Sequence, residues 1–143
     1  MQPFNEEPLT AEELEQDCLC YINFLGKPVK AARFFAGKIH ETASSNIATY
    51  FKQPLDFYKD LVFSAAIYNK CITDDTDFES RDLSQYDSAV EAYYYLIDYL
   101  IQKQVASTRL ALGNTKVTRI FVDGGFSKND IYMYLLAQSF PTM

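Results

Sequence analysis

The longest run of helical hydrophobic spacing extends from about Ser84 to Leu112 and predicts a major core helix. Ser84 and Asp87 have the spacing of a capping box at the start of this helix, and Gly113 follows the last periodic position as a stop signal. The positions predicted to face the core are Val90, Tyr94, Ile97, Ile101, Val105, Thr108 and Leu112. The run of tyrosines at 93–95 is interpreted as packing between helices, or against a missing neighbour, in preference to a sugar-stacking platform.

Two shorter segments show the same spacing. In residues 38–51 the apolar face comprises Ile39, Ala43, Ile47 and Tyr50. In residues 55–68 it comprises Leu55, Tyr58, Val62 and Ala66. His40 is not part of a zinc-protease motif, because that motif needs a second histidine four residues later and Ser44 occupies this position. It is interpreted as a surface or capping residue.

Other segments have the composition of strands. Residues 18–24 and 29–35 are β-rich and flank a Gly-Lys-Pro turn, which predicts a hairpin. Near the end of the chain, the apolar run at 120–122 predicts a strand buried on both faces. This last strand has no obvious parallel neighbour within the chain.

A glycine turn and a helix follow that strand directly. Gly124 and Gly125 free the backbone to turn, and Asn129 is predicted to start a helix. The apolar face of that helix comprises Ile131, Leu135 and Leu136. Ligands of open α/β sheets bind beyond the carboxyl ends of strands, so this turn is a candidate nucleotide site. A plain strand-to-helix connection would use the same two glycines, and that alternative stays open.

The sequence Val-Asp-Gly-Gly-Phe-Ser-Lys-Asn at 122–129, with the helix that follows, resembles the adenosine motif of the FGGY carbohydrate kinases. The resemblance implies an α/β fold, a partial actin-like ATPase (ribonuclease H-like) domain with a β-hairpin, several helices and a strand–glycine turn–helix. It also implies nucleotide-binding roles for four residues, Gly124, Gly125, Ser127 and Asn129. Asp123 is given a supporting role, and Phe126 stands where a third glycine is common in the family.

A weaker resemblance to bacterial rhamnulose and fuculose kinases extends over the rest of the chain. It implies that residues 1–143 are part of the second, ATP-side domain of such a kinase, incomplete at both ends. The parent enzyme would use ATP and Mg²⁺ to phosphorylate a hydroxyl of a ketose or deoxyketose such as rhamnulose, fuculose or xylulose. No residue here matches the family's catalytic motifs, so no catalytic residue is assigned and the chain alone is expected to be inactive.

Two other classes of function compete with that of a kinase. A non-catalytic module for nucleotide sensing or subunit contact is the alternative, because residues 1–143 form an open reading frame without catalytic motifs. A dinucleotide-binding domain is disfavoured, because the glycines lack the Gly-x-Gly-x-x-Gly spacing.

Charge and composition limit the kinds of partner that are expected for this chain. The 143 residues carry a net charge of −6, which argues against nucleic acid as a partner. No segment approaches the length and apolarity of a membrane span, so no membrane association is expected. Three cysteines without a secretory signal favour a cytoplasmic chain with reduced thiols and no metal site. Self-association is expected through exposed apolar surface, either on the long helix or at the unpaired strand.

Overall fold

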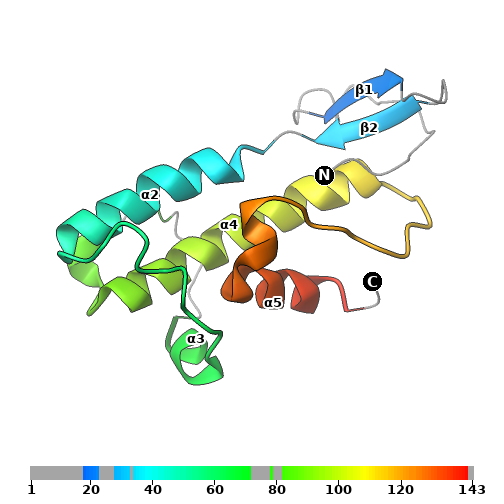
Figure 1. Ribbon diagram of the computed structural model, residues 1–143. Helices are drawn as coiled ribbons and strands as arrows, with labels where there is room; N and C mark the ends of the chain where they lie inside the picture. The colour runs from blue at the N-terminus through cyan, green and yellow to red at the C-terminus, as the bar shows by residue number, and fades with distance from the viewer. Residues whose placement is uncertain (1–17, 23–27, 33, 72–77, 79–81, 142–143) are drawn as a thin grey trace.

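The chain forms a helical structure in which one long helix runs through the centre (Figure 1). The computed structural model describes residues 18–22, 28–32, 34–71, 78 and 82–141. Its α-helices are α2 (Ala36–Tyr50), α3 (Ala65–Cys71), α4 (Ala89–Leu112) and α5 (Asp130–Ser139). The 3-10 helices among the described residues include η2 (Leu83–Gln85) and η3 (Gly125–Lys128).

Helix α4 provides the centre of the core. Helices α2, α3 and α5 all contact it. Of the seven positions predicted to face inward, five are buried: Tyr94, Ile97, Ile101, Thr108 and Leu112. Val90 and Val105 are half-buried and pack against the same core. The predicted core face of this helix is therefore confirmed, and the tyrosines at 93 and 94 are buried packing residues.

The boundaries of α4 are set by residues that satisfy its free backbone groups. Ser88 is the N-cap, and its hydroxyl accepts a hydrogen bond from the Glu91 backbone N–H at 3.1 Å. The predicted capping box at Ser84 is wrong, because Ser84 lies within η2 and an extended Tyr86 separates η2 from the helix. Gly113 closes the other end with φ of 52°, as predicted.

Substituting Ser88 by alanine is expected to lower the free energy of unfolding by about 1 kcal/mol, because the Glu91 N–H loses its partner. Ser84→Ala removes the same hydroxyl from an exposed residue and is expected to change stability by less than about 0.5 kcal/mol. Urea unfolding of the two variants gives the comparison. Equal losses would contradict the assignment of Ser88 as the cap.

The predicted α/β, actin-like fold is wrong. The strands that the structure describes are β1 (Cys18–Ile22) and β2 (Pro28–Ala32), which pair antiparallel with Cys18 opposite Ala32. The residues between these strands lie outside the described part of the chain. The segment 120–122 forms no strand, and Phe121 within it is 81% exposed. A buried strand needs neighbours that pair with its backbone, and the described residues offer this segment none.

The predicted helix at 55–68 is also wrong over most of its length. Residues 55–60 form turns, and α3 begins only at Ala65. The backbone between them is held by a side chain of α4, since the Tyr94 hydroxyl accepts from the Ser64 N–H at 2.8 Å and donates to the Val62 carbonyl at 3.2 Å. These long-range bonds replace the local bonds of a helix, and Val62 is left exposed.

Candidate functional site

The glycine turn at 123–127 is closed by side chains of its own residues. The Gly124 N–H donates to Asp123 Oδ1 at 2.7 Å, and the Ser127 hydroxyl donates to the Gly124 carbonyl at 2.6 Å. Gly124 has φ of 81° and ψ of −159°, a conformation that is essentially restricted to glycine. In this structure Asp123 and Ser127 therefore shape the turn.

Gly124→Ala is expected to destabilise the protein by about 1–3 kcal/mol, because a Cβ is strained at positive φ although space is open around it. Gly125→Ala is the matched control, since its added Cβ also meets nothing within 4 Å and its φ is not positive. Guanidinium unfolding of both variants separates backbone strain from steric effects. A similar small loss in the two variants would contradict the strained backbone at Gly124.

Asn129 joins the turn to the core. It caps α5, because its Oδ1 accepts the Tyr132 backbone N–H at 3.0 Å. Its Nδ2 then faces the other way and donates to the Tyr93 hydroxyl at 2.7 Å. The predicted start of the last helix is confirmed, and Ile131, Leu135 and Leu136 are buried as predicted.

The Tyr93 hydroxyl also contacts His40 of α2, with 2.8 Å between the oxygen and Nε2. Because the hydroxyl oxygen already accepts from Asn129, its own hydrogen is available for His40 Nε2, which then acts as an acceptor. Burial raises the pKa of Tyr93 well above its usual value, so this hydroxyl stays protonated. Three elements far apart in the sequence thus meet through one buried hydroxyl group.

The pKa of His40 lies below its ordinary value of 6.5, because burial disfavours the imidazolium form. The unfolded chain therefore takes up a proton before the folded chain does as the pH falls. The stability due to neutral His40 is present above pH 6.5, declines below it and is lost once the pH passes the folded pKa.

We expect the free energy of unfolding to rise with pH through the range just below 6.5. The chain has a single histidine, so its ring protons in an NMR titration report the folded pKa without ambiguity. His40→Gln keeps a neutral polar group and is expected to remove this part of the pH dependence. A folded pKa at or above the ordinary value would contradict the prediction.

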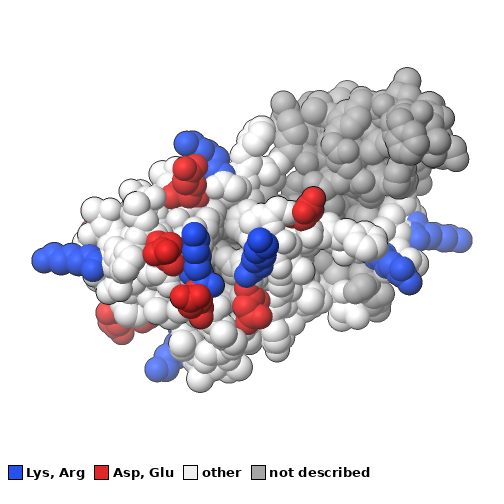
Figure 2. Space-filling view, in the orientation of Figure 1, with Lys and Arg blue, Asp and Glu red and all other residues white. Residues whose placement is uncertain are grey.

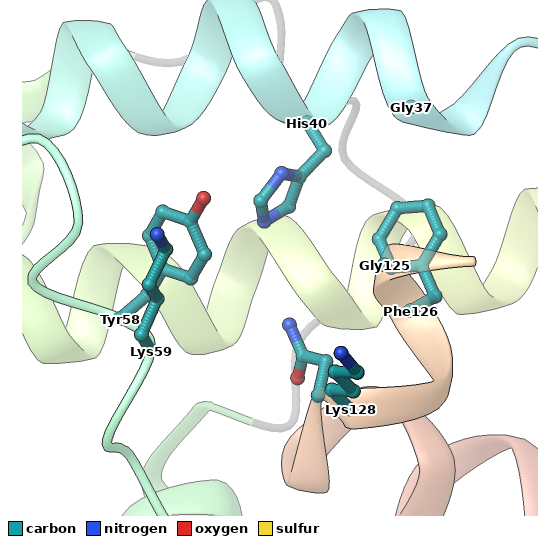
Figure 3. Close-up of a pocket in the computed structure, with 8 residues that line it drawn as sticks. Gly37, His40, Tyr58, Lys59, Gly125, Phe126 and Lys128 are labelled. Carbon is teal, nitrogen blue, oxygen red and sulfur yellow. The ribbon is translucent and has the colours of Figure 1, made fainter.

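A pocket of about 580 Å³ lies between α2, the turns at 55–60 and the glycine turn (Figure 3). It is lined by Gly37, His40, Tyr58, Lys59, Gly125, Phe126, Lys128 and Asn129. The His40 ring points from α2 into the space between Tyr58 and Phe126 (Figure 3). Its centroid lies 4.8 Å from that of Tyr58 and 5.4 Å from that of Phe126, with both pairs edge to face. The pocket thus has aromatic walls and two lysines among its lining residues.

The structure brings only part of the predicted site to this pocket. Gly125 and Asn129 line it, whereas Gly124, Ser127 and Asp123 are not among the lining residues. Residues 40, 58 and 59 were missed as site residues, because their positions depend on the folding of distant segments. The phenyl ring of Phe126, a departure from the resembled motif, contributes one wall.

Charge is mixed on the face of the molecule that Figure 2 shows. Figure 2 shows acidic and basic side chains interspersed on the face that is drawn, with no basic stripe there. No cluster of three or more His, Cys, Asp or Glu residues that could hold a metal ion occurs in the described ranges. Among the helices that the structure describes, none has the length and apolar character needed to cross a membrane.

Comparison of the chain with protein-family models, curated proteins and solved structures finds no match. The resemblance to sugar kinases therefore stays a prediction from residues 122–129 and their surroundings.

Proposed function

We propose that this chain binds an adenine nucleotide, in particular ATP, in the pocket between α2 and the glycine turn. The observation that carries the proposal is the composition of that pocket, in which the Gly125–Asn129 turn faces the rings of His40 and Tyr58. A volume of about 580 Å³ lies within the range of small-molecule sites, roughly 300–1,000 Å³.

The lining residues match the two halves of a nucleotide. A purine base has an aromatic face that stacks on side-chain rings, and His40, Tyr58 and Phe126 all line the pocket. Lys59 and Lys128 are exposed residues that line the same pocket, and ammonium groups bind phosphate as point charges. Gly125 has no side chain, so a ligand can approach its backbone closely.

Gly125→Val gives the cleanest test of the site. A Cβ at this position meets no atom within 4 Å and φ is not positive, so valine adds bulk at the pocket wall without straining the turn. Calorimetric titration should show ATP binding to the wild type and little or none to Gly125→Val. Asn129→Ala is a poorer test, because it also removes the α5 cap.

Two further variants separate the base from the phosphates. Phe126→Ala is expected to weaken adenosine and ATP binding alike, by about tenfold, through the lost stacking surface. Lys59→Ala combined with Lys128→Ala is expected to weaken ATP several-fold and leave adenosine unchanged. The charge-matched control is Lys70→Ala combined with Lys116→Ala, which removes two positive charges from exposed residues that do not line the pocket. A folded wild-type chain that binds neither adenosine nor ATP would contradict the proposal.

The resemblance extends the proposal to a longer protein. In that protein, ATP with Mg²⁺ would phosphorylate a ketose or deoxyketose hydroxyl, and this chain would contribute the adenosine side. Carboxylate base and phosphate-binding turns would come from residues outside this chain. The test is ATP turnover by the full-length protein over a panel of ketoses and deoxyketoses. Nucleotide binding without turnover of any sugar would favour the alternative, a nucleotide-sensing module.

A further inference from the structure

The segment that joins α4 to η3 combines the composition of a strand with exposure to solvent. Figure 1 shows residues 114–124 as a long loop beyond the end of α4. Within the described part of the chain, no backbone hydrogen bond engages residues 117–122. Phe121 is the most exposed of the large hydrophobic side chains that the structure describes. An exposed β-prone segment with free backbone groups is a template for pairing with another strand.

Exposure alternates along this segment. Arg119, Phe121 and Asp123 are exposed, whereas Ile120 and Val122 are half-buried. Val122 packs against the hydrophobic core. A period of two residues is that of a β-strand, in which successive side chains point to opposite faces. One face of the segment thus lies on the molecule, and the other presents a cation, an aromatic ring and a carboxylate.

The exposed face is complementary to itself. When two copies of residues 119–123 run antiparallel with Phe121 opposite Phe121, Arg119 of each copy lies opposite Asp123 of the other. Ile120 then lies opposite Val122. Aromatic pairs and opposite charges directly across two strands both stabilise pairing. A two-fold dimer requires this kind of self-complementary patch.

We propose that residues 119–123 pair with the same residues of a second copy of this chain, forming a two-stranded antiparallel connection between protomers. The register places Phe121 on the two-fold axis and forms two Arg119–Asp123 pairs. The tyrosines at 93 and 94 are buried in the core, so these rings of the long helix are not offered to a second copy. None of residues 119–123 lines the nucleotide pocket, and Arg119 and Phe121 lie outside the glycine turn, so variants at these two positions test the dimer independently of the nucleotide site.

Sedimentation equilibrium of the full chain provides the first measurement, and the wild type is expected to dimerise reversibly. Arg119→Asp creates two like-charged pairs across the dimer and is expected to raise the dissociation constant about tenfold. Lys116→Asp makes the same change of charge on an exposed residue outside the pairing register. It is expected to leave the dissociation constant within about twofold of the wild type.

Charge reversal supplies the sharper test of register. Asp123→Arg alone is expected to weaken the dimer, but its mixture with Arg119→Asp places opposite charges at both pairs and should restore a mixed dimer. Phe121→Lys alters only an exposed side chain of the monomer and places two cations at the axis, so it should give monomers. Circular dichroism checks the fold of each variant.

Three results would overturn the proposal. One is a wild type that remains monomeric at high concentration. Another is a dimer that Arg119→Asp weakens no more than Lys116→Asp does, because that dimer uses a different surface. The third is a dimer that persists unchanged in Phe121→Lys.

Discussion

Substituting Leu100 by alanine is expected to lower the free energy of unfolding by about 2–5 kcal/mol. Leu100 lies on α4 with no exposed surface, within the cluster that α4 shares with α2 and α5. Truncation removes buried methyl groups and leaves a cavity whose walls cannot fully collapse. Chemical denaturation monitored by circular dichroism measures the loss, and the slope of the transition shows whether unfolding remains two-state.

Leu55→Ala is the matched control for this experiment. It makes the same chemical change at a residue that is 66% exposed in the turns before α3. The expected change in unfolding free energy is less than about 0.5 kcal/mol. The sequence pattern placed Leu55 on the buried face of a helix, so this variant also tests that correction. A loss at Leu55 as large as that at Leu100 would contradict the described arrangement of residues 55–60.

Tyr93→Phe is expected to cost about 1–3 kcal/mol, because it removes one hydroxyl and leaves two polar side chains without their partner. The amide of Asn129 loses its acceptor at 2.7 Å, and His40 Nε2 loses its neighbour at 2.8 Å. His40 lies on α2 and Asn129 at the start of α5. The substitution therefore removes the hydrogen bonds that connect α4 to these two elements. Thermal or urea unfolding gives the free-energy change.

The control is Tyr50→Phe, which removes the same hydroxyl from a side chain that is 50% exposed at the end of α2. Its expected effect is within about 0.5 kcal/mol of zero. A double-mutant cycle of Tyr93→Phe with His40→Ala measures the coupling between the two side chains. Additive losses in that cycle would show that the Tyr93–His40 contact contributes nothing to stability.

Local signals predicted the helices well where packing and capping agreed with them. Gly113 ends α4 and Asn129 begins α5, because each residue satisfies backbone groups within its own turn. The periodic apolar positions of α4 face the core, since the helix has a fixed repeat and buries one stripe. The predicted N-cap of α4, Ser84, lies four residues before the observed one, Ser88, because either serine has a hydroxyl that can cap a helix.

Strand prediction failed for a different reason. The residues at 120–122 have strand composition, but a strand acquires its hydrogen bonds from another segment. The described residues supply no such segment, and Phe121 faces solvent. The expected helix at 55–68 failed similarly, because Tyr94 holds the Val62 and Ser64 backbone in a non-helical path.

The sequence by itself determined α4 and α5, their apolar faces and the glycine turn between them, because periodicity, capping and backbone freedom act within a few residues. Only the tertiary structure determined which residues come together at the pocket. Its histidine reaches Tyr93 across 53 residues, and Asn129 reaches the same tyrosine across 36. Contacts at such separations depend on how the helices pack against each other, and no local pattern records that packing.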